Sequence, residues 1–564
     1  MAVPHHVRKE PPSMLIDTRR ALPGSIFEAE VCVIGSGPAG AAAATELADR
    51  GLRVVVLEGG GPGLSRTARD TYRGITGRGK HDPVDAVRQK RLGGTSLVWG
   101  GRCAPLDDVD FSDREWMPGA AWPIRHEELR AWYPAAQRHL DAGACEYSAP
   151  ESGFPAGPPG IHSDTLRWDD LWRWSPPTSF APTVETMAKA GRIRLFLHAT
   201  VARLERDPVS GNATEAVVVP RPGCDIRIRA RHFVVAAGGL ESVRILLASD
   251  GYGGTGTGSG IGDEYGQVGR HYMTHPVGEV GRLRLTTAGR TLGLGYLPTD
   301  DGVYARRMLS LSPQVQADHR LGNLKAALWF ADPKDAEHGD ALLSTFALTY
   351  WGLGKLRAGF KAAGTHAQYS HTTDIGHHMR NVAADPLRVA RFARGWARPR
   401  ITGERRVPSF MPLDSAHCRL RFDAEQTPDP ANRVTLDRER DALGQHRLRV
   451  DYRVSTGDRE AIVTSLSLIG KELERTGLAH VDLSDVERVH DMDMTDGTHQ
   501  MGLLRMSDSP RTGVVDPECR VHGTPNVHVA SSAVFPSAGA VGPTLALVAL
   551  ACRTAELIAA DVRG

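Results

Sequence analysis

The chain lacks three features that would point to particular classes of protein. Its seven cysteines are scattered over 564 residues and form no C-x-x-C pair, which argues against a disulfide framework and against a zinc site. No stretch approaches the roughly 20 apolar residues of a membrane span, and residues 1–20 contain no apolar signal segment. The formal net charge is only +2, so bulk attraction to nucleic acid or to a membrane is not expected.

The composition that remains is that of an ordinary globular protein. Hydrophobic residues make up 41% and charged residues 24% of the chain, which is the usual range for a globular fold. The length predicts one to three domains with a large core. We expect a cytoplasmic protein that binds no metal, no nucleic acid and no membrane.

An N-terminal stretch has the order of a dinucleotide-binding unit. AEVCVI at 29–34 is typical of a short buried strand, and GSGPAG at 35–40 is a G-x-G-x-x-G turn. AAAATELADRG at 41–51 indicates a helix that ends in glycine, and RVVVLEGG at 53–60 indicates a second strand with an acid near its end. Together they predict a βαβ unit that binds a dinucleotide.

The glycines and the acid of this unit have separate roles. Gly35 permits the tight turn, Gly37 lets the backbone approach a pyrophosphate, and Gly40 lets helix and strand pack closely. N–H groups at the helix N-terminus then face the phosphates. Glu58 is placed to accept hydrogen bonds from the ribose hydroxyls, which disfavours NADP; the alternative is a solvated acid at a strand end. The turn alone does not separate FAD from NAD.

A second glycine cluster follows in RLGGTSLVWGGRCAPLDDVDF at 91–111. Gly93, Gly94, Gly100 and Gly101 permit the backbone to approach something flat or anionic. Taken alone, such glycines are equally typical of a structural loop.

The C-terminal part contains a histidine and a buried helix in an order that suits alcohol oxidation. THQMGLLRM occupies 498–506, and the apolar run LALVALACRTAEL follows at 545–557. A neutral imidazole such as that of His499 is able to remove a hydroxyl proton near neutral pH. Pro543 is suited to start the helix, because its missing N–H costs nothing there. The plain alternatives are a structural histidine and a core helix.

Together these segments resemble the glucose–methanol–choline family of FAD-dependent oxidoreductases over nearly the whole chain. The motifs that carry the resemblance are VCVIGSGPAGAAAATELADRGLRVVVLEGG, RLGGTSLVWGG, HATVARL at 198–204, FVVAAGGLESVRILLAS at 233–249, VGRHYMTHP at 268–276, EQTPDPANRVTL at 425–436 and the C-terminal stretch.

The resemblance implies an α/β fold with a Rossmann-like FAD-binding domain, the GMC fold, and a discontinuous α+β substrate-binding domain built on an antiparallel sheet. In this division the FAD-binding domain comprises 25–125, 195–275 and 487–564, and the substrate-binding domain comprises 126–194 and 276–486. Within the latter, we expect strands in 313–330 and 340–352, and short helices and loops that include a lid in 354–408.

The resemblance also implies which residues contact FAD. Beyond the glycine turn and Glu58, the expected contacts are Gly93, Gly94, Thr95 and Ser96 along the flavin and pyrophosphate, Val201 at the adenine, Ala237, Gly238 and Gly239 at the adenosine, Ser532 and Ala533 at the pyrophosphate or flavin, and Pro543 and Thr544 at the helix start near the flavin. Some relatives attach FAD through a histidine after the second glycine cluster. TSLVWGG contains none, so we expect noncovalent FAD.

The implied reaction is oxidation of a CH–OH group to the carbonyl, with His499 as the general base and hydride transfer to flavin N5. The family usually has asparagine or histidine before the proline that starts the last helix, as a second polar group on the substrate oxygen. Gly542 stands there in this chain, and a water, another residue or nothing takes its place. The acid that is usual in this part of the family's C-terminal stretch is replaced as well, since VASSAVFP at 529–536 has Ser531.

Two groups of residues suggest a substrate class. Asp491, Asp493 and Asp496 precede His499 and are suited to hold a cationic substrate such as an amino sugar, although a solvated acidic loop has the same composition. Gly542 is expected to contact the substrate. The aromatic residues form either a sugar-binding wall or part of the core; they are Trp99, Trp329, Phe330, Tyr350 and Trp351.

Three functions remain open at this point. The first is oxidation of a sugar-like polyol, including a primary hydroxyl of an aminoglycoside, with oxygen or another electron acceptor. The second is a pyranose or C-glycoside ring-hydroxyl oxidase or dehydrogenase that uses a separate electron acceptor. The third is a flavin-binding protein with reduced catalytic ability, which the glycine at position 542 suggests.

Overall fold

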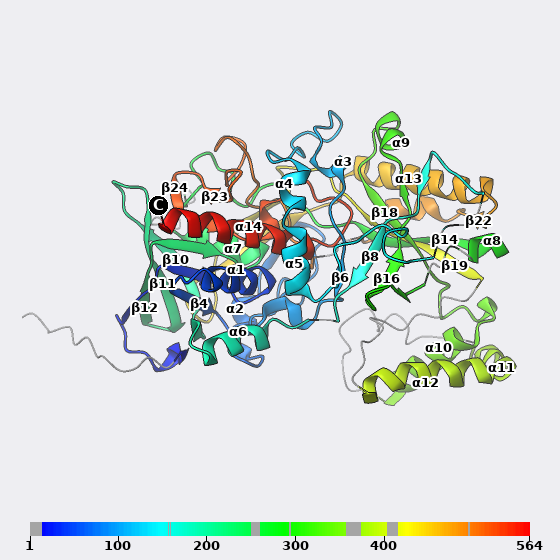
Figure 1. Cartoon of the computed structure of the whole chain (residues 1–564), viewed down its shortest axis with the longest axis horizontal. Helices are drawn as coiled ribbons and strands as arrows, with labels where there is room; N and C mark the ends of the chain where they lie inside the picture. The colour runs from blue at the N-terminus through cyan, green and yellow to red at the C-terminus, as the bar shows by residue number, and fades with distance from the viewer. Residues whose placement is uncertain are drawn as a thin grey trace, which may run out of the picture.

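The protein is represented by a computed structural model with two bodies of β-structure side by side (Figure 1). Elements around a mostly parallel sheet occupy one side of Figure 1, and elements around an antiparallel sheet occupy the other. The structure describes residues 14–155, 157, 160–176, 178–249, 260–290, 292, 295–356, 374–402, 416–494 and 497–563.

The first body is a seven-stranded sheet with the strand order β1-β9-β4-β3-β13-β24-β23. Its central strands β3 (Val31–Ile34) and β4 (Val54–Glu58) are buried along their whole length, as expected of parallel strands that are covered on both faces. The other strands are β1 (Leu15–Asp17), β9 (Ile193–Leu197), β13 (His232–Val235), β23 (Arg520–Val521) and β24 (Thr524–Val529). The parallel order confirms the predicted α/β nucleotide-binding fold.

Two helices from opposite ends of the chain pack together beside this sheet. Helix α1 (Pro38–Asp49) buries a row of alanines, and α14 (Thr544–Arg563) packs against it. The small alanine side chains allow the two helices to approach closely. As a result, the N-terminal glycine turn and the start of the last helix belong to the same layer (Figure 1).

The second body is a four-stranded antiparallel sheet with the order β18-β19-β14-β22. Its strands are β18 (Leu324–Phe330), β19 (His417–Ala424), β14 (Val277–Leu285) and β22 (Ala479–Asp482). In β19 the apolar residues Leu420 and Phe422 join a core shared with α13 (Thr456–Arg475). Because side chains alternate along a strand, Arg421 and Asp423 lie on the opposite face.

Further sheets accompany these two bodies, and three of them have three or four strands. One contains β10 (Val201–Arg206), β11 (Ala213–Arg221), β12 (Cys224–Arg229) and β2 (Ile26–Glu28). A second contains β15 (Leu297–Pro298), β16 (Tyr304–Arg307), β8 (Leu171–Trp174) and β6 (Arg102–Cys103). The third contains β20 (Arg433–Arg440), β21 (His446–Tyr452) and β5 (Ile75–Gly79).

The strand expected in 340–352 is wrong. This segment lies in a helix, α10 (Ala341–Leu356), because its alanines and leucines are strong helix formers and its apolar residues are too dense for strand alternation. Of 313–330, only β18 is a long strand, and Pro313–Asp318 forms the short helix α9. Helices α11 (Ile375–Ala384) and α12 (Pro386–Thr402) fall in the expected helical region, while 357–373 and 403–415 lie outside the described residues.

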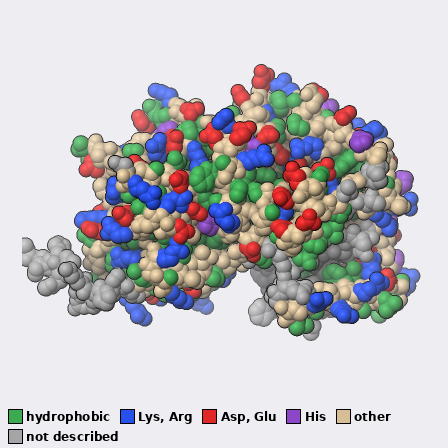
Figure 2. Space-filling model, viewed as in Figure 1, with side chains coloured by type: hydrophobic (Ala, Val, Ile, Leu, Met, Phe, Trp, Pro, Cys, Tyr) green, Lys and Arg blue, Asp and Glu red, His purple; other side chains and the backbone are tan. Residues whose placement is uncertain are grey.

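The surface and the helices carry little further information on partners. Basic and acidic side chains are interspersed over the face seen in Figure 2. Among the helices that the structure describes, none combines the length and apolarity needed to cross a membrane. The domain division stays a prediction. Strands β20 and β21, assigned to the substrate-binding domain, contact α7 (Gly239–Ala248), and β21 pairs with β5.

Candidate active site

A cavity of ≈ 560 Å³ lies between the two bodies and joins segments from both ends of the chain. Its wall includes the glycine turn at 34–39, the second glycine cluster at 94–100, the start of α7, and residues 498–500 and 542–544. The volume is within the range of cofactor and ligand sites.

The glycine turn leaves room for a ligand at one of its three glycines. A Cβ on Gly35, which has a φ of 109°, would lie 2.4 Å from the carbonyl oxygen of Ala236. A Cβ on Gly40 would lie 2.1 Å from the carbonyl oxygen of Gly35. Gly37, in contrast, has nothing within 4 Å of its Cβ position and faces the cavity at the N-terminus of α1. The backbone at Gly37 is therefore open to close approach by a phosphate group.

Ser36 connects the turn to the acid and to the second glycine cluster. Its hydroxyl donates to Glu58 Oε2 at 2.5 Å and accepts from the N–H of Gly93 at 3.0 Å. Glu58 Oε1 accepts from the N–H of Gly60 at 2.7 Å. Burial raises the pKa of Glu58, although these hydrogen bonds oppose the shift. Glu58 lines the cavity beside the turn, where donor groups of a ribose would stabilise its charged form.

The end of the cavity that contains Glu58 also has a wall of charged residues, which could not be predicted from the sequence. Tyr72, Arg88, Lys90 and Glu241 line it, and the Arg88 guanidinium lies 4.0 Å from the centre of the Tyr72 ring. Burial lowers the pKa of Lys90 to about 8, although Glu241 raises it. The Lys90 ammonium donates to Thr71 Oγ1 at 2.9 Å.

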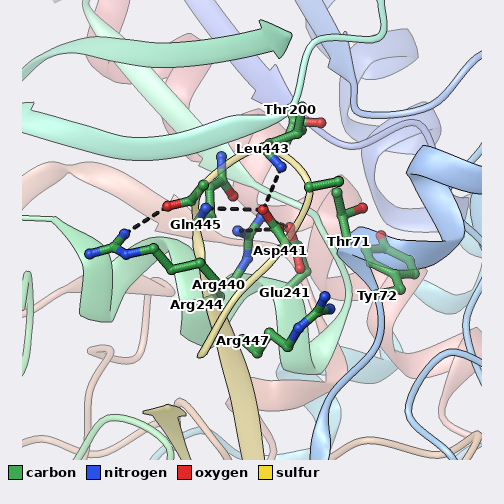
Figure 3. A network of polar contacts seen from close by, with 12 residues as sticks. Thr71, Tyr72, Thr200, Glu241, Arg244, Arg440, Asp441, Leu443, Gln445 and Arg447 are labelled. Carbon is green, nitrogen blue, oxygen red and sulfur yellow. Dashed lines mark hydrogen bonds and ion pairs between the residues drawn. The ribbon is translucent and has the colours of Figure 1, made fainter. Parts of the chain in front are cut away.

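A buried polar network supports this wall (Figure 3). Asp441 and Leu443, from the loop between β20 and β21, lie beside Glu241 and Arg244 of α7 in Figure 3. Arg244 forms an ion pair with Glu241, and its Nη1 is 3.8 Å from Asp441 Oδ2. The N–H of Leu443 donates to Asp441 Oδ1 at 2.8 Å. The network fixes the first turn of α7, which lines the cavity.

The donors and acceptors of the cavity fit a bound dinucleotide. Gln89 lines the cavity, and its buried Oε1 accepts no hydrogen bond from a described residue. Such an atom is costly unless a ligand or water satisfies it. Together with the open backbone at Gly37 and the buried acid Glu58, it gives the cavity the features that a dinucleotide needs.

A pair of histidines lies at the other end of the cavity. Met273 and Met501 exchange two backbone hydrogen bonds of 3.0 Å in an antiparallel bridge. His275 follows Met273 by two residues and His499 precedes Met501 by two, so the antiparallel bridge places the two histidines opposite each other. Their Nδ1 atoms are 2.8 Å apart, and His275 Nε2 is 3.1 Å from the carbonyl oxygen of Ala538.

Gly542 is the neighbour of the His499 ring within the cavity. A Cβ at this position would be 3.9 Å from His499 Nε2 and 3.7 Å from the carbonyl oxygen of Arg102. Pro543 and Thr544, the first residue of α14, line the cavity next to it. The polar backbone atom beside Gly542 is thus an acceptor, which does not replace the donor that a side chain of asparagine would offer.

Most of the expected cofactor contacts lie in the cavity wall, but some do not. The residues in the wall are Gly35, Gly37, Glu58, Gly94, Thr95, Ser96, Val201, Ala237, Gly238, Gly239, Ser532, Pro543 and Thr544, as well as His499 and Gly542. Gly40, Gly93 and Ala533 are behind it, where Gly40 and Gly93 allow close backbone packing. The roles assigned to all these residues stay predictions.

The acidic loop is not part of the wall. Asp491 is exposed, and Asp493 is exposed and 4.0 Å from Lys80 Nζ. Neither lines the cavity, and Asp496 lies outside the described residues. Of the five aromatic residues considered, Trp99 and Trp329 line the cavity. Phe330 belongs to a small buried cluster, and Tyr350 and Trp351 lie on α10.

Comparisons with known proteins agree with this geometry. A family model for FAD-dependent oxidoreductases matches residues 30–321, more than half of the chain, and a model for GMC oxidoreductases matches residues 428–551. Paromamine 6'-oxidase of Streptomyces fradiae is 24% identical, over 94% of this chain and 92% of that protein. 2-Methyl-1,2-propanediol dehydrogenase of Mycolicibacterium austroafricanum is 22% identical, over 95% and 96%.

A solved structure supports the fold alone. A formate oxidase variant from Aspergillus oryzae RIB40 aligns with a TM-score of 0.52 at 16% identity, over 96% of this chain and 100% of that chain. The two family models cover the glycine turn at one end of the cavity and His499 at the other. The chain therefore belongs to the glucose–methanol–choline family of FAD-dependent oxidoreductases and oxidises CH–OH groups.

Proposed function

We propose that the chain oxidises a hydroxyl-bearing carbon of a sugar-like substrate, with His499 as the general base. The contact between His275 and His499 is the observation that supports this choice of the base. A carbonyl oxygen only accepts, so the 3.1 Å contact with Ala538 requires a proton on His275 Nε2. In a neutral ring His275 Nδ1 is then an acceptor, and His499 must donate to it from its own Nδ1.

Because the proton of the His499 ring is then on Nδ1, Nε2 is the basic nitrogen of this ring. The Nε2 atom is the one that lies 3.9 Å from the Cβ position of Gly542, in the wall of the cavity. A substrate hydroxyl at this point would give its proton to Nε2. The role of His275 is to hold the tautomer and the ring orientation, as a positioning residue.

FAD supplies the hydride acceptor when it is bound. The glycine turn, Glu58 and the segment 94–96 would hold it, and we propose that they do so without a covalent bond. Among the described residues that line the cavity there is no cysteine, and the one histidine is His499, which is assigned to proton transfer.

The aromatic lining supports a sugar-like substrate. Trp99 and Trp329 line the cavity. At the same end as His499, so do Trp172, Trp174 and Tyr296, which the sequence did not single out. Aromatic rings are well suited to the apolar faces of sugar rings. The similarity to paromamine 6'-oxidase makes an amino sugar one candidate within this class, beside neutral and acidic sugars. Either oxygen or a separate acceptor completes the cycle.

The proposal predicts a yellow protein whose FAD is released by acid. Acid precipitation is expected to leave a colourless pellet and free FAD in the supernatant, because no covalent bond retains it. Anaerobic addition of sugars and polyols is then expected to bleach the flavin absorbance. Return of the colour in air would indicate an oxidase, and a need for an added quinone would indicate a dehydrogenase.

Two results would contradict these statements separately. A yellow pellet would show covalent FAD. A flavin that dithionite reduces but that no sugar or polyol reduces would exclude the proposed substrate class while leaving the cofactor in place.

The positioning role of His275 predicts that its replacement slows flavin reduction more than it weakens substrate binding. His275→Phe removes the acceptor for His499 Nδ1, and we expect the limiting rate of reduction to fall about 10- to 100-fold, measured by anaerobic stopped flow. His275→Asn offers an amide oxygen as acceptor and is expected to recover part of the rate. Equal loss in both variants would mean that His275 only fills space.

A further inference from the structure

The substrate end of the cavity has a wall of four aromatic and two arginine side chains. We call it the arginine–aromatic wall. Its members all line the cavity that contains His499, and they are Arg102, Trp172, Trp174, Tyr296, Trp329 and Arg421.

The wall is continuous from the histidine to Arg421. The carbonyl oxygen of Arg102 faces Gly542, and its guanidinium lies 4.4 Å from the centre of the Trp172 ring. Trp174 and Tyr296 follow, with ring centres 4.4 Å apart. The remaining members, Trp329 and Arg421, are on neighbouring strands β18 and β19.

The charges along the cavity are unevenly distributed. The acids that line it, among the described residues, are Glu58 and Glu241, and both lie at the dinucleotide end. Arg102 and Arg421 are the charged residues of the arginine–aromatic wall. An ammonium group would therefore meet like charge at this end of the cavity, whereas an anion would meet opposite charge.

Arg102 is already neutralised by a protein carboxylate. Its Nη1 and Nη2 donate to the two oxygens of Asp423, each at 2.9 Å. Burial would raise the pKa of Asp423, but the charge of Arg102, followed by that of Arg421, outweighs this effect and holds the pKa at about 2. Arg102 is thus a structural partner of Asp423, and it is not needed for a ligand.

Arg421 is not neutralised in this way. Its Nη1 lies 3.9 Å from Glu279 Oε1, which is too far for a hydrogen bond, and no described residue accepts one from its guanidinium. Burial raises the pKa of Glu279, although Arg421 opposes the shift. The side chain of Arg421 is 31% exposed.

The aromatic ring of Trp329 holds the guanidinium of Arg421 in place. The Arg421 Cζ is 4.6 Å from the centre of the Trp329 ring, and Arg306 lies 5.0 Å from the same centre. Stacking on a ring orients the plane of a guanidinium while its edge donors stay available. The planar fork of Arg421 is therefore preorganised for a planar anion, and a carboxylate matches it with two parallel hydrogen bonds.

We propose that the substrate is a polyhydroxy acid whose carboxylate binds Arg421 while the hydroxyl to be oxidised faces His499. This inference rests on the proposed function and narrows its substrate class. The carboxylate is not altered in the reaction; it anchors the molecule. The inference also runs against a cationic amino sugar, because such a substrate would meet Arg421 with like charge.

Three six-carbon polyols that differ at one carbon test the proposal. Gluconate, glucitol and glucamine carry a carboxylate, a hydroxyl and an ammonium group there. We expect gluconate to reduce the flavin of the wild-type holoenzyme anaerobically with a kcat/KM about 10- to 100-fold above that of glucitol, because a hydrogen bond between charged groups strengthens binding by about that factor. Glucamine is expected to have the lowest kcat/KM of the three. Arg421→Gln should remove most of this preference.

A binding measurement separates the anion site from turnover. Glutarate has carboxylates but no hydroxyl to oxidise, and it is expected to perturb the flavin spectrum of the wild type and to bind at least about 10-fold more weakly to Arg421→Gln. Arg282→Gln is the matched control, since Arg282 is an exposed arginine on the adjacent strand β14, and it should behave as wild type.

The outcomes distinguish this inference from the function on which it rests. Equal reduction by gluconate and glucitol, with both affected alike by Arg421→Gln, would overturn the anionic substrate and leave the sugar oxidation intact. A preference for glucamine would overturn it in favour of an amino sugar. Glutarate binding that depends on Arg421, with no reduction by any of the three polyols, would support the anion site and contradict the oxidation of sugar-like compounds.

Discussion

His499→Ala is expected to reduce the rate of flavin reduction by substrate about 10²- to 10⁴-fold, the usual contribution of a general base. The flavin content should not change, because the glycine turn and Glu58 form the dinucleotide end of the cavity and His499 lies at the other. The rate is measured by anaerobic stopped flow, and the flavin content by the ratio of flavin to protein absorbance.

The control for this variant is His480→Ala. His480 is an exposed histidine on β22 and does not line the cavity, so its removal tests the effect of losing a histidine as such. Wild-type reduction kinetics in His499→Ala would remove this residue from the chemistry. Loss of flavin together with the rate would mean that its ring supports the cofactor, and it would leave the base unassigned.

Gly37→Ala and Gly40→Ala are expected to fail in different ways. A methyl group on Gly37 meets no protein atom within 4 Å. We therefore expect the free energy of unfolding of the apoprotein to stay within about 1 kcal/mol of the wild-type value. The same methyl group occupies the space that a pyrophosphate needs. The affinity for FAD should therefore fall about 10- to 100-fold, as for other overpacked sites.

Gly40→Ala places its methyl group 2.1 Å from the carbonyl oxygen of Gly35. Backbone meets backbone there, so the strand and α1 must separate, and we expect a loss of about 3 kcal/mol or more in the stability of the apoprotein. Thermal unfolding of apoproteins and titration with FAD separate the two effects. Gly395→Ala, on α12 with open space around it, is the control for exchanging glycine with alanine. Unchanged FAD affinity in Gly37→Ala would place the dinucleotide elsewhere.

The part of the site that could be predicted from the sequence is the part built by local backbone. The turn at Gly35, Gly37 and Gly40 lies within six consecutive residues, and the strand and helix on each side are long enough to show their periods. Glu58 belongs to the same βαβ unit. Local geometry of this kind is encoded in a short stretch of residues, which is why the prediction of an α/β fold was correct.

The contacts that could not be predicted join segments far apart in the chain. His275 lies in VGRHYMTHP, a motif that carried the family resemblance, yet nothing local indicates that its partner is His499. The bridge between Met273 and Met501 creates that contact. In HCRLRFDA the alternation of charged and apolar residues indicates a strand with one polar face. It does not indicate that this face, with Arg421, covers a cavity.

The position of β24 has a consequence for the biosynthesis of the enzyme. β24 pairs with β13 in the seven-stranded sheet, and residues 542–544 complete the cavity wall. While the ribosome is still making the middle of the chain, β13 is an unpaired sheet edge and the site for FAD has no floor. The complete wall of the cavity therefore cannot form before the last segment of the chain has joined the fold.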